Sequence, residues 1–287
     1  MQHTTNENGD HRLAFDSWGE FVADAEKRAT HGRGWGGDAS LTAPPHWAGT
    51  PDMQTAVDLA RHGWHDGTRR LLSGLDSTHA PAGIPAMHPA WDWDVAGAVP
   101  DVGAYCAGVP EHMGTPGDVD PNAQPVTRLY IPGVAGAMVE AQQLERYAVA
   151  VASHVESARA GGHSTEVFWT WTSQGRSGGP PRRLNLLVPL IRAGQTMDAA
   201  VLAFAFHPST LRRLAFAVIE QRDELAFLGS TFGRVKTLAP ADAEPGAVIL
   251  PGPNDLYHAG ALDSIEAAAE YIGRAIADAQ PTYAEAA

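Results

Sequence analysis

The densest apolar stretch of this chain, residues 126–220, most limits what it can fold into. Residues 126–131 are β-branched and aromatic, which suits a pleated strand, and Pro132-Gly133 ends that run. From residue 137 to residue 160 the apolar positions recur at helical spacing, and Gly161-Gly162 then stops the helix. The stretch therefore opens with a strand that is followed by a long helix.

Two further runs, residues 165–171 and 184–191, are also typical of strands. The residues between them, 173–181, are rich in Gly, Ser and Pro and predict the tip of a hairpin. Residues 198–206 fit either a short helix or a strand, and their spacing does not decide between the two. A helix is expected next, because Pro208 suits the first helical position and His207 or Ser209 can cap it.

The helix after Pro208 has one expected inner face. Its apolar residues at helical spacing are Leu211, Leu214, Ala215 and Val218. The charged residues that fall off this face are Arg212, Arg213 and Glu220. Further along, residues 247–250 read as a buried strand, and Asp263-Ser264 caps a last amphipathic helix. The segment 126–280 is thereby predicted to be an α/β core domain, with a frayed tail over 281–287.

The chain before this domain is less regular. Residues 1–12 are polar and predict a disordered tail, and residues 13–76 carry short helical patterns that predict a helical accessory region. Residues 77–125 form a Pro-rich arm or linker, since eight prolines lie between residues 76 and 125. Its Trp, Tyr and Val residues favour packing over disorder, and Cys106 is expected to be a small core residue.

Composition narrows the classes of function. The formal charge of -13 and the pI near 5.3 disfavour non-specific nucleic-acid binding, which needs a positive face. A single cysteine leaves no disulfide within the chain and no multi-cysteine metal site, and it fits a reducing compartment. No run of 18 apolar residues is present, so no membrane-spanning segment is expected.

The order of strand, helix, hairpin, helix, strand and last helix resembles that of von Willebrand factor A-like domains. This resemblance implies a three-layer α/β fold with helices on both faces of the sheet. Such domains often hold a divalent ion in a loop after the first strand. Here that loop, residues 131–137, reads Ile-Pro-Gly-Val-Ala-Gly-Ala and has no carboxylate or hydroxyl. The oxygen ligands that Mg²⁺ needs are missing, so metal-dependent adhesion is not carried over.

Several short segments are similar to an uncharacterised family of tailed-phage and prophage proteins. They are residues 56–64, residues 93–97, residues 99–102 with Tyr105 and Gly108, and residues 207–213. The resemblance implies a phage origin, with a location in the host cytoplasm or on the virion. A phage structural or packaging protein is the partner that it suggests, and it implies no established activity.

Candidate binding and metal residues are few. His62 and His65 are spaced for one helical face, but Gly63 interrupts the helix and no third ligand is identifiable, so surface histidines are the alternative. Trp64 beside them is a binding candidate. The tip of the hairpin carries three basic residues that could bind nucleic acid or an acidic partner: Arg176, Arg182 and Arg183. The alternative is that they only make the loop soluble.

The candidate catalytic residues are Asp92, Asp94 and His207. The two aspartates flank Trp93 at strand spacing, so both carboxylates would face one side, as in a metal-dependent nuclease or on a solvated strand. His207 could act as a base at a helix start while Arg212 and Arg213 hold an anion. The alternative is a capping histidine with solvated arginines.

The phosphate-binding loop Gly-x-x-x-x-Gly-Lys-Ser/Thr is missing from the sequence, and no cofactor is predicted. We therefore expect a non-enzymatic protein-interaction or assembly module. The alternative is a nucleic-acid-processing enzyme that uses Asp92, Asp94 and His207.

Overall fold

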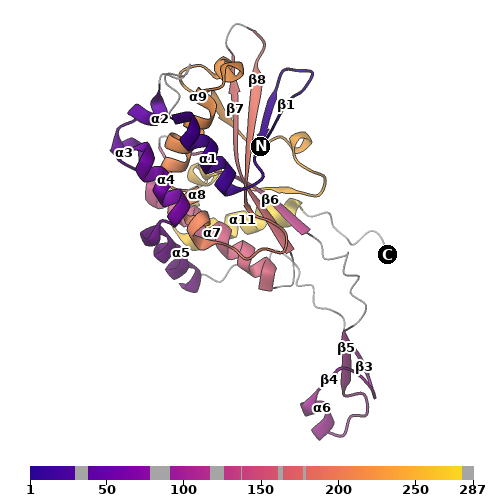
Figure 1. Cartoon of the computed structure of the whole chain (residues 1–287). Helices are drawn as coiled ribbons and strands as arrows, with labels where there is room; N and C mark the ends of the chain where they lie inside the picture. The colour runs from indigo at the N-terminus through magenta and orange to yellow at the C-terminus, as the bar shows by residue number, and fades with distance from the viewer. Residues whose placement is uncertain are drawn as a thin grey trace.

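A computed structural model of the chain (Figure 1) describes residues 1–29, 38–77, 91–116, 126–136, 138–160, 164–176 and 179–279. Its main feature is a seven-stranded sheet in the order β1-β2-β8-β7-β6-β10, with β9 paired to β7. Its strands are β1 (Gln2–Thr5), β2 (His11–Ala14), β6 (Val126–Pro132), β7 (Ser164–Gly175), β8 (Arg182–Ile191), β9 (Arg234–Lys236) and β10 (Val248–Ile249).

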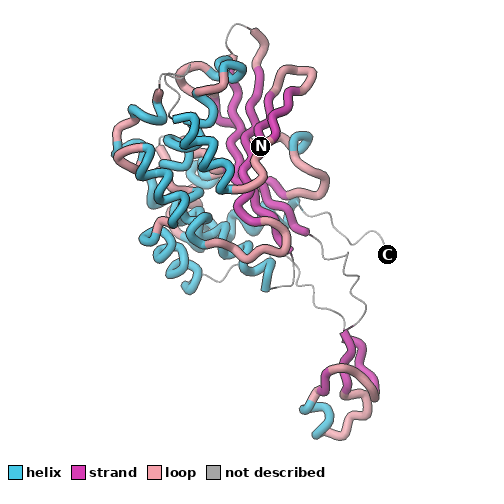
Figure 2. The backbone as a smooth tube through the Cα atoms, viewed as in Figure 1, coloured by secondary structure: helices cyan, strands magenta, loops and turns pink. Residues whose placement is uncertain are grey.

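The strands of the sheet lie side by side (Figure 2) and form both parallel and antiparallel pairs. β6 runs parallel to β7 and β10, and β2 runs parallel to β8. β7 and β8 are antiparallel and form the expected hairpin, with Trp169 opposite Val188. The chain passes from β6 to β7 through α7 (Ala141–Ala160), so the expected order of strand, helix and hairpin is confirmed. The fold is a mixed α/β fold whose central sheet is flanked by helices.

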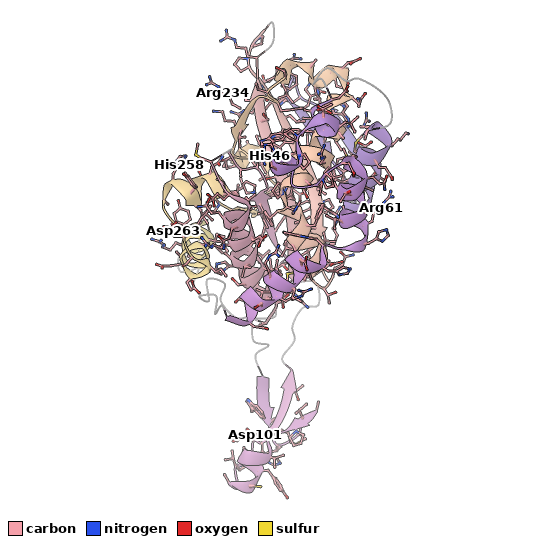
Figure 3. All side chains as sticks on the ribbon, turned by 90° about the vertical axis from the view of Figure 1, so that its left-hand side faces the viewer. His46, Arg61, Asp101, Arg234, His258 and Asp263 are labelled. Atoms are coloured by element: carbon pink, nitrogen blue, oxygen red, sulfur yellow. The ribbon has the colours of Figure 1, made fainter. Side chains whose placement is uncertain are left out.

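Helices cover one face of this sheet and lie in front of it in the turned view of Figure 3. They share a single hydrophobic core with the sheet. The last helix of this layer, α11 (Ile265–Ala279), packs on α7, and Ser264 Oγ caps it by accepting a hydrogen bond from Ala267 N at 3.1 Å. The segment left open by the sequence is α8 (Ala199–Ala205), capped by Asp198. The other helices are α1 (Trp18–Ala29), α2 (Ala39–Thr42), α3 (Pro45–Ala48), α4 (Met53–His62), α5 (His65–Ser77), α9 (Phe216–Glu220) and α10 (Pro253–His258).

The sequence predicts a helical accessory region over residues 13–76, but its described residues, 13–29 and 38–76, pack into the same domain as the sheet. Phe21 of α1 and Val57 of α4 are fully buried in the same core as the strands. α1 packs on α9, while α5 packs on α7 and α8. The helices of this region are short and amphipathic, so each needs the sheet layer to cover its apolar face.

The other face of the sheet is expected to carry a second layer of helices, but its cover is different. Tyr130, Phe168 and Leu187 form a small cluster there with Leu238. The residues packed over this cluster come mainly from the segment 238–249, whose only helical turn in the described chain is the short 3-10 turn η3 (Pro240–Asp242). This segment contains Pro240, Pro245 and Gly246, which disfavour a continuous α-helix. The order typical of von Willebrand factor A-like domains is therefore not confirmed.

The N-terminus is ordered, which corrects the predicted disordered tail over residues 1–12. β1 and β2 form a hairpin, and β2 adds to β8 with Leu13 opposite Leu186. Leu13 is fully buried. Four residues of alternating burial are too short a pattern to recognise without the partner strand, because a strand is stabilised mainly by its neighbours.

A second, three-stranded sheet lies apart from the main one (Figure 1). It consists of β3 (Trp91–Asp94), β4 (Val99–Pro100) and β5 (Met113–Pro116), with the short helix α6 (Val102–Cys106). We call residues 91–116 the small-sheet unit. Cys106 is exposed on α6, so the expectation that it is a core residue is wrong. The rest of the predicted arm, residues 78–90 and 117–125, and the predicted tail 281–287 lie outside the described residues.

No helix in the described part of the chain is both long enough and apolar enough to span a membrane.

Candidate functional site

The segment that starts at Pro208 carries most of the candidate residues. It is helical, as expected, but its middle turns, η1 (Thr210–Ala215), are a π-helix that continues into α9. A π turn holds one extra residue and so rotates the following residues by about 100° about the helix axis. All residues from 213 to 220 are buried, so Arg213 and Glu220, which fall off the expected inner face, are interior residues as well.

Arg213 is an interior residue. Its side chain is 0 % exposed. Its two terminal nitrogens donate hydrogen bonds of 2.7 to 3.2 Å to backbone carbonyls of Ser40, Leu41, Ala43, Thr50 and Pro51. Burial lowers the pKa of its guanidinium, and the nearby Asp52 opposes this shift. Arg213 therefore fixes the segment 40–51 on the helix, and it is not available to bind an anion.

Glu220 binds the same segment from the end of α9. Its carboxylate accepts hydrogen bonds from Ser40 N at 3.0 Å and from Ser40 Oγ at 2.6 Å. Burial raises the pKa of the Glu220 carboxyl, while the hydrogen bonds from Ser40 oppose that shift. Arg213 and Glu220 together replace the backbone hydrogen bonds that the irregular segment 40–51 cannot make with itself.

His207 lies among aromatic rings. Its ring stacks on Phe204 with centroids 5.2 Å apart and meets the edge of Trp64 at 4.5 Å. Ser209 N donates to His207 Nδ1 at 3.2 Å. Burial lowers the pKa of His207 to about 4, and the positive charge of Arg70 adds to this effect. His207 is therefore neutral at pH 7 and is held as a packing and capping residue.

Trp64 contacts both His207 and Arg70, and Arg70 in turn binds Glu145 of α7. The Arg70 guanidinium lies over the Trp64 ring at 4.9 Å and donates to both carboxylate oxygens of Glu145, at 2.7 and 2.9 Å. A cavity of about 180 Å³ borders this group. Two of the candidate residues, Trp64 and His207, are thus brought together, and Arg70 and Glu145 join them without a signal in the sequence.

His62 and His65 are both exposed, at the end of α4 and the start of α5. Gly63 separates the two helices at a φ of 93°, as expected for a residue that ends a helix. The described residues contain no group of three or more His, Cys, Asp or Glu side chains placed to hold a metal ion.

Arg212 lies at the mouth of a second cavity. Its guanidinium stacks on the Trp47 ring at 4.6 Å and donates a hydrogen bond to the Trp47 carbonyl oxygen. Burial lowers the pKa of Arg212. The cavity beside it has a volume of about 130 Å³. The aromatic residues in its wall are Trp47, Trp171, Phe216 and Phe232.

The three arginines of the hairpin have different surroundings. Arg176 is exposed at the end of β7. The Arg182 guanidinium lies over the Phe227 ring at 4.4 Å, and the backbone N–H of Arg183 donates to Asp10 at 2.7 Å. Only Arg176 matches the expected solvent-exposed loop tip, since Arg182 and Arg183 are partly buried against neighbouring segments.

Asp92 and Asp94 lie on β3 of the small-sheet unit. The carboxylate of Asp94 is exposed and accepts a hydrogen bond from Val95 N at 2.7 Å, while the side chain of Asp92 lies outside what the structure describes. His207, Arg212 and Arg213 belong to the main domain, so the structure does not bring the candidate nuclease residues into one cleft (Figure 1).

The small-sheet unit has a feature that the sequence pattern does not reveal. Among its described side chains no apolar residue is buried. Its large exposed apolar residues are Trp93, Val95, Val99, Val102, Tyr105 and Val109. Asp101, which Figure 3 labels in this unit, caps α6 by accepting a hydrogen bond from Ala104 N at 3.0 Å.

Comparison with known families identifies the chain only at the level of a domain. Residues 4–261 match the model of a family described as a domain of unknown function, DUF7192. The chain belongs to the DUF7192 family. The matched part of this DUF7192 domain runs from β1 to the residues after α10, so it includes the small-sheet unit and the segment 207–220. No curated protein and no solved structure matches the chain.

Proposed function

We propose that this chain is a protein-interaction module that binds its partner through the small-sheet unit. The observation that carries the proposal is a folded unit in which none of the described apolar side chains is buried. Val102 and Tyr105 on α6 are 66 % and 64 % exposed. A unit of this length cannot gain much stability from its own burial, and clustered exposed apolar side chains mark interaction surfaces.

The charge of the unit defines the kind of partner. Residues 91–116 contain Asp92, Asp94, Asp101 and Glu111 and no lysine or arginine. Apolar groups within an acidic surface are complementary to an apolar protein surface that is flanked by lysine or arginine. Nucleic acid is disfavoured as a partner, because its phosphates would be repelled.

The resemblance of several segments to tailed-phage and prophage proteins supports a phage structural or packaging protein as this partner. The interaction would then take place in the host cytoplasm or on the virion. The order of strand, helix and hairpin in the main domain supports a relation to von Willebrand factor A-like domains, which fits a non-enzymatic role.

Cys106 allows a direct test. It is the only cysteine of the chain and is exposed on α6, so it accepts a maleimide photo-crosslinker without any substitution. The labelled full-length chain, illuminated in extract of the native host, is expected to give one dominant crosslinked protein. Val102→Asp combined with Tyr105→Asp is expected to lower that yield by at least about tenfold, because it places charge in the contact.

The matched control moves the same label to another exposed apolar position. In Cys106→Ser with Leu72→Cys the label sits on α5 of the main domain, where Leu72 is 46 % exposed. This variant is expected to lose the crosslinked protein. Equal yields from the two label positions, or an unchanged yield with the two aspartates, would contradict the proposal.

A further inference from the structure

The cavity beside Arg212 has the location of a ligand site. Val134 and Ala135, which follow the end of β6, form part of its wall. β6 is parallel to both of its neighbours, β7 and β10. In sheets of this kind ligands bind outside the carboxyl ends of parallel strands, where the loops leave room between strand and helix.

Two unusual backbone conformations border the same cavity. Phe232 has a φ of 58°, which is rare for a residue with a large side chain. The π-helix Thr210–Ala215 supplies Leu211 and Arg212 to the wall. Both conformations cost free energy, and both are found more often at functional sites than elsewhere.

Two residues of the wall carry hydrogen-bond donors that have no acceptor among the described residues. Arg212 makes no ion pair with any described residue, and its one hydrogen bond uses Nη1, which leaves Nε and Nη2. Trp171 is 2 % exposed, and its indole nitrogen has no acceptor among the described residues. Buried donors and partly buried charges usually have a partner, so the site favours a ligand with acceptor oxygens and a negative charge.

The size and the walls of the cavity limit the rest of the ligand. A volume of about 130 Å³ is similar to that of an apolar cavity of about 150 Å³ that binds benzene. Four aromatic side chains line it, which favours a flat ring. We propose that this cavity binds a small aromatic carboxylate, with its single ring among the aromatic residues and its carboxylate paired with Arg212.

Calorimetric titration of the full-length chain with benzoate tests this proposal. Benzoate is expected to bind with a Kd below about 1 mM. Benzamide has the same ring without the charge, and cyclohexanecarboxylate has the charge without the aromatic ring. Each is expected to bind at least about tenfold more weakly than benzoate, because each lacks one of the two features that the cavity recognises.

Variants separate binding in the cavity from binding elsewhere. Arg212→Gln is expected to weaken benzoate binding at least about tenfold. Because Arg212 also holds Trp47, a second variant is needed: Val235→Trp fills the mouth of the cavity from a residue that is 42 % exposed, and it is expected to abolish binding. Arg192→Gln removes a guanidinium that lies over Phe168, away from this cavity, and is expected to leave the Kd for benzoate unchanged.

The proposal fails if benzoate gives no binding heat up to about 10 mM, or if Val235→Trp binds it as tightly as the native chain.

Discussion

At the scale of single residues, His207 couples the stability of the fold to pH. Its pKa falls from 6.5 to about 4 in the folded chain, first because the ring is buried and then because Arg70 is near. Between these two values the unfolded chain binds more protons than the folded one. Stability from this group is therefore complete above about pH 6.5 and is lost as the pH falls through the window.

His207→Phe is expected to remove this part of the pH dependence. The size of the shift corresponds to up to about 3 kcal/mol of free energy of unfolding between pH 7.5 and pH 4. Urea unfolding of the variant and the native chain at several pH values measures the difference. His11 and His154 also have pKa values lowered by burial, so the variant keeps some slope. The exposed His46, labelled in Figure 3, gives the control His46→Phe, which should keep the slope of the native chain.

The sequence could not predict the environment of His207. Pro208 and Ser209 do indicate a helix start, and that prediction is confirmed. The two rings that bury the imidazole come from different places: Phe204 is local, whereas Trp64 is brought in from the start of α5. Periodicity within a segment contains no information about such distant neighbours.

At the scale of elements, the π turn in Thr210–Ala215 continues into a helix whose residues from 213 to 220 are all buried. Arg213 donates to carbonyls of the segment 40–51, and Arg212 and Ser209 donate to two further carbonyls of that segment. A regular α-helix is the default assumption when apolar spacing is read, and this assumption placed Arg213 and Glu220 off the buried face. The assumption failed because residues 213–220 are buried on all sides, so apolar spacing does not separate buried positions from exposed ones there.

Arg213→Met tests the role of this element. It keeps an apolar side chain of similar length but leaves buried carbonyls without donors, so the free energy of unfolding is expected to fall by about 3 to 5 kcal/mol. Arg176→Met, at an exposed position, is the control and should change stability by less than about 0.5 kcal/mol. Urea denaturation gives both values, and similar small losses in the two variants would show that the carbonyls find other partners.

The regular elements of the main domain were predictable for a related reason. β6, α7, the β7–β8 hairpin and α11 have long or strongly apolar patterns, and these lie close to the predicted positions. The β1–β2 hairpin and the cover over Tyr130 and Phe168 were not predictable, because both consist of short polar or Pro-rich segments. Such segments become ordered only through contacts with distant strands.

At the scale of the whole molecule, the chain contains two units that differ in how they are stabilised. Both hydrophobic clusters of the main domain lack any residue from the small-sheet unit. The unit therefore contributes nothing to the described core, and its own stability depends on what it contacts. From the sequence, the position of this arm was evident from its prolines, but its fold and its exposed apolar face were not.

Replacing residues 78–125 with about 15 Gly and Ser residues is expected to leave the main domain folded. Because no core contact is lost, the thermal midpoint should stay within about 3 °C of that of the native chain. Calorimetry measures the midpoint, and benzoate titration of the shortened chain checks that the cavity beside Arg212 is intact. A fall of the thermal midpoint by more than about 10 °C would show that residues 78–125 contribute to the stability of the main domain.

The pairing of β2 with β8 has a consequence for synthesis of the chain on the ribosome. Leu13 can reach its partner Leu186 only after the hairpin β7–β8 has been made. At a synthesis rate of about 5 to 20 residues per second, Leu13 of β2 stays uncovered for roughly 10 s or longer before Leu186 has been made. The N-terminal hairpin is therefore translated first but can join the sheet only after β8 has been made, and an uncovered apolar strand in this interval is a site for aggregation.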